Sequence, residues 1–228
     1  MSCHSSKFDP SKDMPDLTGK VVIVTGGNTG LGLESCLKIA ARNPAHLYLA
    51  ARTASKADKA IAEVKKVAPG VSISHLSLDL ASFPSIANAA KTVLANSDRL
   101  DILLNNAGVM ALPPGLTEQG YEIQFGTNHV GHALFTHLLM PRLLETAQKP
   151  GADVRIVNLS SMGHQLASKE GIVFNELKTT MEPRITWTRY GQSKLANILF
   201  TKELAKRYPS ITSVSVHPGV IKTDVSGT

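Results

Sequence analysis

Apolar runs alternate with amphipathic segments along the chain, and this pattern predicts six strands separated by helices. The first run, at 20–26, is rich in β-branched residues, as a strand buried on both faces should be. Five further strands are predicted at 46–52, 71–79, 100–108, 153–161 and 211–219. Strands that alternate with helices favour a parallel sheet covered on both faces, so the predicted fold class is α/β.

Helical patterns fill the intervals between the predicted strands. They lie at 30–43, 55–68, 82–97, 118–148 and 189–208. Ser55 and Ser82 stand where they would cap the second and third of these helices. The fourth is long and imperfect, and a bend is expected near Gly126 and at Pro141. No linker or repeat interrupts the pattern, which predicts a flexible polar arm at 1–17 and a single folded domain at 18–228.

Charge and cysteine content exclude several classes of protein. The net charge is +6, but the basic residues are spread along helix faces, so no nucleic-acid partner is expected. Cys3 and Cys36 form no disulfide framework, and neither they nor the histidines show metal-ligand spacing. We therefore expect a reducing, cytoplasmic compartment and no metal site. The chain has neither a signal-peptide pattern nor an apolar run of 18 residues, so no integral membrane segment is predicted.

A glycine-rich segment, TGGNTGLG at 25–32, joins the first predicted strand to the first helix. Glycines allow a tight turn and a close approach of the backbone to a ligand, and a helix N-terminus presents free N–H groups to a diphosphate. A plain tight turn is the alternative. The strand–loop–helix context favours dinucleotide binding, and the residues expected to contact the cofactor are Gly26, Asn28, Thr29, Gly30, Leu31 and Gly32.

Arg52 ends the second predicted strand, 20 residues after Gly32. In dinucleotide-binding folds an acidic residue at this place holds the ribose 2′-hydroxyl, whereas an arginine accommodates a 2′-phosphate. No carboxylate occurs here before Asp58, which favours NADP(H) over NAD(H). The alternative is an ordinary solvent-exposed arginine.

Tyr190 and Lys194 lie four residues apart in the last predicted helix, so their side chains share a face. The pKa of a free phenol is about 10, and a nearby ammonium lowers it, which would allow proton exchange with an alcohol or ketone near neutral pH. A surface lysine beside a half-buried tyrosine would give the same spacing. The helix also shows an apolar stripe, formed by Leu195, Ile198, Leu199 and Leu204.

Four motifs occur in a fixed order: TGGNTGLG, NNAG at 105–108, YGQSK at 190–194 and HPGVIKT at 217–223. Together they resemble the short-chain dehydrogenase/reductase family. The segments GYEIQFGTNHVGHALFTHLL, SKLANILFTKELA and VHPGVIKTD resemble its retinol dehydrogenase and WW-domain oxidoreductase branch. The resemblance covers about Leu17 to Asp224. It implies a Rossmann-type doubly wound parallel sheet that binds NADP(H).

The resemblance also implies roles for individual residues. Tyr190 matches the general acid/base, and Lys194 the residue that binds the nicotinamide ribose and lowers the tyrosine's pKa. Ser161 matches the substrate-orienting serine, with Ser160 as the weaker alternative. Asn128 matches the asparagine that holds a proton-relay water. Further cofactor contacts are expected from Asp79, Asn105, Ala107, Val220 and Thr223.

Some of these residues also have a purely structural interpretation. Ser161 could cap the irregular segment that follows it, Asn128 could be helical filler, and Asp79 could be a turn residue.

The expected activity is therefore NADP(H)-dependent interconversion of an alcohol and a carbonyl on a small lipophilic substrate. Retinoid-like, steroid, terpenoid and polyketide substrates stay open, as does a tailoring step in secondary metabolism. The loops at 109–119 and 162–188 carry the apolar residues that suit such molecules, namely Met110, Leu112, Met162, Leu166, Met181 and Trp187. An epimerase or dehydratase is the remaining enzymatic alternative, and TGxxxGxG and NNAG argue against it.

The sequence ends at Thr228, shortly after HPGVIKT. The resemblance implies that a substrate-covering segment, a helix and a seventh strand of the family are missing, and that these parts often build a dimer edge. A truncated product and a homo-oligomer in which another chain supplies the cover are both open. A second function is therefore an NADP-binding pseudoenzyme or regulator that is inactive because the lid is absent.

Overall fold

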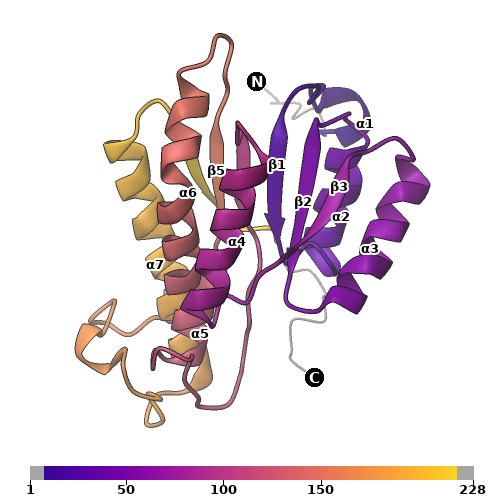
Figure 1. The fold of residues 1–228 in the computed structure, drawn as a ribbon. Helices are drawn as coiled ribbons and strands as arrows, with labels where there is room; N and C mark the ends of the chain where they lie inside the picture. Colours follow the sequence, from indigo (N-terminus) through magenta and orange to yellow (C-terminus); the bar gives the residue numbers. More distant parts are fainter. Residues whose placement is uncertain (1–7, 220–228) are drawn as a thin grey trace, which may run out of the picture.

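The computed structural model describes residues 8–219 and contains one six-stranded parallel sheet (Figure 1). The strand order is β3-β2-β1-β4-β5-β6, so the direction of winding reverses between β1 and β4. The bounds are β1 Val21–Thr25, β2 His46–Ala51, β3 Ile73–Ser77, β4 Ile102–Asn105, β5 Arg155–Leu159 and β6 Thr212–Val216. All six predicted strands are confirmed, each within its predicted range. Ligands of such sheets bind outside the carboxyl ends of the strands, at the point of reversal.

Helices cover both faces of the sheet, which confirms the doubly wound α/β prediction (Figure 1). On one face α2 and α3 pack against β1 and β2 through an apolar cluster that includes Cys36, Val64 and Leu49. On the other face α4, α6 and the end of α7 pack around Ile23, Phe135 and other apolar residues. The bounds are α1 Pro10–Asp13, α2 Gly30–Ala40, α3 Ala54–Val67, α4 Phe83–Asn96, α5 Ile123–Phe125, α6 Gly131–Ala147 and α7 Thr186–Arg207.

The predicted helix caps and the predicted long helix differ from the structure in detail. Ser55 lies inside α3, because the helix begins one residue earlier, after Thr53. Ser82 does precede α4, but its hydroxyl donates to Glu118 Oε2 at 2.6 Å instead of capping the helix. The segment predicted as one bent helix is divided into α5, a π-helical turn at Gly126–Val130, and α6, which contains Pro141. The irregular segment before α7 holds two short 3₁₀ turns, Met162–Leu166 and Phe174–Glu176.

The apolar stripe predicted for α7 is only partly correct. Leu204 is buried, but 49% of Leu199 is exposed. The buried face instead carries polar side chains that find partners inside the protein, namely Gln192, Ser193, Asn197 and Thr201. Periodicity found the helix but not the face that it buries.

Part of the segment predicted as a flexible arm is attached to the domain. Residues Pro10–Asp13 form the short helix α1, and the Leu17 side chain is buried. The Leu17 N–H donates to the Arg42 carbonyl at 2.7 Å. Within residues 8–219, no helix combines the length and the hydropathy needed to cross a membrane.

Candidate active site

A cleft of about 530 Å³ lies at the carboxyl ends of the strands. Its walls come from the β1–α2 loop, the ends of β2 and β5, the segment after β4, and α7. Most of the predicted site residues line it: Gly26, Asn28, Thr29, Gly30, Leu31, Gly32, Arg52, Asp79, Ala107, Ser161, Tyr190 and Lys194. These residues span most of the chain, so the parallel sheet is what gathers them at one edge.

The glycine loop leaves no room for side chains at its closest points. Gly26 and Gly30 have φ of +66° and +52°, in the left-handed region that glycine tolerates best. A Cβ on Gly32 would lie 2.1 Å from the Gly26 carbonyl oxygen, and one on Gly26 would lie 3.0 Å from Ala107 Cα. The backbone is therefore bare and faces the cleft where α2 begins, an arrangement that fits a diphosphate.

Thr25 ties this loop to the segment after β4. Its hydroxyl oxygen accepts from the backbone N–H of Asn106 and of Ala107, each at 2.9 Å. The same oxygen lies 2.8 Å from His132 Nε2 and 3.4 Å from the Leu104 carbonyl, and His132 Nδ1 lies 3.0 Å from the Asn128 carbonyl. Burial lowers the pKa of His132 to about 3, so the ring is neutral. It donates from Nδ1 and accepts the Thr25 proton at Nε2. This link was not predicted, because its three residues are far apart or carry no local pattern.

The structure does not bring Asn105 to the cleft. This residue is 2% exposed, and its amide donates to Thr136 Oγ1 at 3.0 Å and to Asn158 Oδ1 at 2.8 Å. It joins β4 to α6 and β5 instead of lining the cleft. The NNAG motif reaches the cleft through Asn106, Ala107 and Gly108.

Tyr190 faces the cleft from the start of α7, beside Ser161 at the end of β5. Burial raises the pKa of Tyr190, and a hydrogen bond with Ser161 acts in the opposite direction. The direction differs from the expected lowering by Lys194, because the burial of the phenol dominates. Ser160 is the weaker candidate for the second hydroxyl, since its Oγ donates to the Lys194 carbonyl at 2.9 Å.

Lys194 is buried, yet it lines the cleft. Its Nζ lies 5.6 Å from the centre of the Tyr190 ring and donates to the Leu159 carbonyl at 3.1 Å. Burial lowers its pKa to about 8. An ammonium has three donors, and among the residues that the structure describes Leu159 is the one acceptor recorded for Lys194. The remaining donors suit the hydroxyls of a ribose.

Asn128 lies in the π-helical turn and is completely buried. Both ends of its side-chain amide form hydrogen bonds with the backbone of Val109. Its Oδ1 accepts from Val109 N at 2.7 Å, and its Nδ2 donates to Val109 O at 2.9 Å and to Ser193 Oγ at 3.0 Å. Its carbonyl accepts from His132 and Asn197. In the structure, Asn128 therefore holds Val109, a residue of the cleft wall, in place. That Asn128 also binds a proton-relay water stays a prediction.

Two basic side chains stand at one end of the cleft, Arg52 after β2 and Lys56 in the first turn of α3. Both are exposed. Asp79 is the only carboxylate among the described lining residues, and its Oδ1 accepts from Ala81 N at 2.9 Å. Lys56 was not predicted, although its place one helical turn after Arg52 was a usable signal.

Several other residues that line the cleft were not among the predicted cofactor contacts, and they include Thr127, His217, Pro218 and Gly219. Val220 and Thr223 lie outside the described residues. Among residues 8–219, no cluster of three or more potential metal ligands occurs.

Comparisons with known proteins give consistent results. The family model described as short chain dehydrogenase matches residues 20–228. The chain is 44% identical over 218 residues to an uncharacterized oxidoreductase of Schizosaccharomyces pombe, covering 94% of this chain and 64% of the relative. It is also 44% identical over 212 residues to retinol dehydrogenase 11 of Mus musculus, covering 92% and 64%. A crystal structure of an uncharacterized protein from Mycobacterium paratuberculosis matches with a TM-score of 0.80 and 32% identity, covering 96% of this chain and 75% of that one.

The chain thus spans just under two thirds of the length of these two curated relatives. The family model nevertheless matches almost the whole of this chain, from the first strand of the sheet onward. The resemblance seen in the sequence is confirmed: the chain belongs to the short-chain dehydrogenase/reductase family and is similar to its retinol dehydrogenases.

Proposed function

We propose that this protein interconverts an alcohol and a carbonyl on a small lipophilic substrate, using NADP(H) as the hydride carrier. One observation carries the proposal. The phenol of Tyr190, the hydroxyl of Ser161 and the ammonium of Lys194 line the same cleft as the bare glycine loop and the cation pair at its far end. A dinucleotide in this cleft would have one end at the glycine loop and its reactive ring beside the phenol.

The residues present fit a phosphorylated dinucleotide. The backbone at Gly26–Gly32 and the N-terminus of α2 would hold the diphosphate. Arg52 and Lys56 supply positive charge where a 2′-phosphate would lie, and Arg52 stands where NAD(H) would require an acidic residue. Asp79, the one carboxylate among the described lining residues, follows β3 and not β2. Lys194 would hold the ribose next to the nicotinamide through its free donors.

The bound cofactor supplies the hydride for reduction and accepts it in oxidation. In reduction, Tyr190 donates its phenolic proton to the carbonyl oxygen as that oxygen gains negative charge, and Ser161 donates a hydrogen bond to the same atom. The raised pKa of Tyr190 keeps the phenol protonated at neutral pH, as an acid must be. The Lys194 ammonium then stabilises the phenolate that is left. Oxidation of the alcohol reverses each transfer.

Apolar side chains favour a lipophilic substrate. Met110 and Met162 line the cleft, and Trp187 packs edge-on against the Tyr190 ring with 6.4 Å between centroids. Half-exposed Leu166 lies on the same 3₁₀ turn as Met162. The similarity to a retinol dehydrogenase supports a retinoid-like or other extended apolar alcohol or aldehyde.

The test compares wild type with Tyr190→Phe on a panel of all-trans-retinal, decanal and a steroid ketone, following NADPH oxidation. Wild type should reduce at least one compound, and the variant should lose about 10²-fold or more in kcat while its Kd for NADPH stays within about twofold. Retained turnover in Tyr190→Phe would refute the assigned acid. NADPH binding by wild type without turnover of any compound would favour the NADP-binding regulator.

A further inference from the structure

A short loop, Val109–Leu112, forms part of the wall of the cleft beside the start of α7, with Val109 and Met110 among the lining residues. The loop is not relaxed, since Ala111 has a φ of +57°. Such a conformation persists where the surroundings determine it, and here side chains from two distant elements do so. Asn128 fixes the first residue of the loop, as described above.

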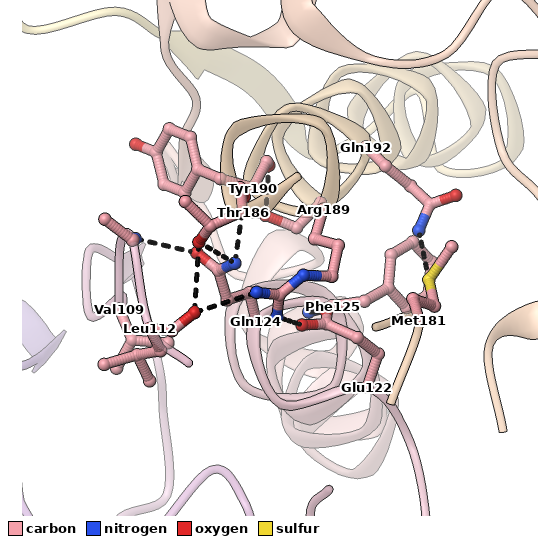
Figure 2. Close-up of polar contacts among 12 residues, drawn as sticks. Val109, Leu112, Glu122, Gln124, Phe125, Met181, Thr186, Arg189, Tyr190 and Gln192 are labelled. Atoms are coloured by element: carbon pink, nitrogen blue, oxygen red, sulfur yellow. Dashed lines mark hydrogen bonds and ion pairs between the residues drawn. The ribbon is translucent and has the colours of Figure 1, made fainter. Parts of the chain in front are cut away.

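Gln124 and Thr186 hold the middle and the end of the loop (Figure 2). The completely buried Gln124 accepts from Ala111 N at 3.0 Å and donates to Thr186 O at 3.1 Å and Thr186 Oγ1 at 3.2 Å. Thr186 is the first residue of α7, and its hydroxyl donates to the Leu112 carbonyl at 3.0 Å. The loop is thereby bonded to the helix that carries Tyr190.

A buried ion pair completes this arrangement (Figure 2). Arg189 is 2% exposed and Glu122 is fully buried, and Arg189 Nη1 donates to Glu122 Oε1 at 2.8 Å. The other arm of the guanidinium, Nη2, donates to the Leu112 carbonyl at 2.9 Å. The second oxygen of Glu122, the residue before α5, accepts from the N–H of Phe125, the last residue of α5, at 2.7 Å. The Arg189 side chain therefore connects the residue before Tyr190 to α5, through Glu122, and to the loop, through Leu112.

A buried pair of this kind is weak evidence for stability, because apolar replacements of similar volume are often as stable. Its geometry points to another role. The forked guanidinium reaches its two acceptors through two separate nitrogens, Nη1 and Nη2, whereas an ammonium has a single nitrogen. The acceptors belong to separate elements, and Tyr190 follows Arg189 directly.

We propose that Arg189, braced by Glu122, is a positioning residue that fixes the Val109–Leu112 loop against the first turns of α7. The spacing between the Met110 wall and the Tyr190 hydroxyl then depends on it, and so does the orientation of the substrate. This inference rests on the function proposed above. The glycine loop, Arg52 and Lys56, to which we assign the phosphates of NADPH, make none of these contacts, so we expect the affinity for NADPH to change little when the brace is lost.

The variant that tests this is Arg189→Lys, which keeps the charge facing Glu122 and loses the fork to Leu112. Its matched control is Arg184→Lys, since Arg184 forms a forked pair with Glu176 at 2.7 Å and touches none of the loop. Hydrogen–deuterium exchange of a peptide covering 109–112 should become about tenfold or more faster in Arg189→Lys and stay unchanged in the control. Misplacement of this wall should lower kcat/KM about 10–100-fold on the best panel compound, with the NADPH Kd unchanged.

A second variant, Thr186→Val, removes the other donor to the Leu112 carbonyl and leaves the ion pair intact. It should raise the same exchange rate, so the proposal stays testable if Arg189→Lys fails to fold. Unchanged loop exchange in both variants would overturn the proposal, as would unchanged kcat/KM when exchange has risen. If wild type turns over no compound, the proposed function fails, whereas loop exchange and acrylamide quenching of Trp187, the single tryptophan, still decide whether the brace exists.

Discussion

Lys194 is expected to lower the stability of the fold that it serves. It is 4% exposed, and burial lowers its pKa from 10.5 to about 8. In the unfolded chain the amine returns to water and binds its proton more tightly. Below pH 8 both states are protonated, and the folded state bears the cost of a buried charge. Between pH 8 and 10.5 the folded state releases its proton first, so the contribution of this group to stability rises with pH in that window.

The magnitude follows from the two pKa values. One pKa unit corresponds to about 1.4 kcal/mol, so the cost at pH 7 is roughly 3 kcal/mol. Lys194→Met keeps the length of the side chain and removes the charge. The Leu159 carbonyl keeps the hydrogen bond from Asn197 Nδ2 at 3.0 Å, so the substitution leaves no unsatisfied acceptor. At pH 7 we expect the free energy of unfolding of the variant to be about 2–3 kcal/mol higher than that of wild type. We also expect the variant to be inactive.

Urea denaturation at several pH values measures this difference. The increase in unfolding free energy caused by Lys194→Met should be constant well below pH 8 and should fall to about 2 kcal/mol at pH 9. Lys202→Met is the control, because Lys202 lies on the exposed side of the same helix, and its effect should stay within about 0.5 kcal/mol. A Lys194→Met protein that is less stable than wild type at pH 7, or a gain that grows with pH, would show that the ammonium stabilises the fold.

Two further predictions concern the cofactor. Arg52→Ala should raise the Kd for NADPH about tenfold and leave that for NADH unchanged, because a charge-assisted hydrogen bond to the 2′-phosphate is lost; fluorescence titration with each cofactor measures this, and an equal loss for both would contradict it. Gly32→Ala should weaken binding of both cofactors more than about tenfold and lower Tm, since its Cβ would lie 2.1 Å from the Gly26 carbonyl. Gly70→Ala is the control, because a Cβ at this position would meet nothing within 4 Å, and it should change neither cofactor binding nor Tm.

Local patterns were enough to predict the sheet and the place of each strand, although the predicted ranges extend up to three residues beyond the observed strands. Each strand is a short apolar run, and a parallel sheet that is buried on both faces requires such runs. The same reasoning located the glycine loop, because a strand, a bare turn and a helix follow one another directly at Gly26–Gly32. The i, i+4 spacing of Tyr190 and Lys194 placed both on one helix face, as the structure shows.

Contacts between distant segments could not be read from local patterns. Asn105 stands in a motif that borders the cleft, but its side chain points to the neighbouring strand and α6, a direction that depends on the pleat of β4. Arg189 and Glu122 are 67 positions apart, and no local pattern in the sequence pairs them. The link from Thr25 through His132 to Asn128 likewise exists only once β1 and the π-helical turn have been brought together.

The failure of the apolar stripe in α7 has a physical reason that concerns the site. A helix normally buries its apolar side, but here the side toward the sheet must hold Lys194 and the hydrogen-bonded groups around it. Asn197 donates to the carbonyls of Leu159 and Asn128, and Ser193 accepts from the Asn128 amide. These bonds fix the lysine and the cleft wall in one rigid unit. Apolar patterning is therefore violated where α7 borders the cleft, so this departure on α7 was itself a signal of the candidate site.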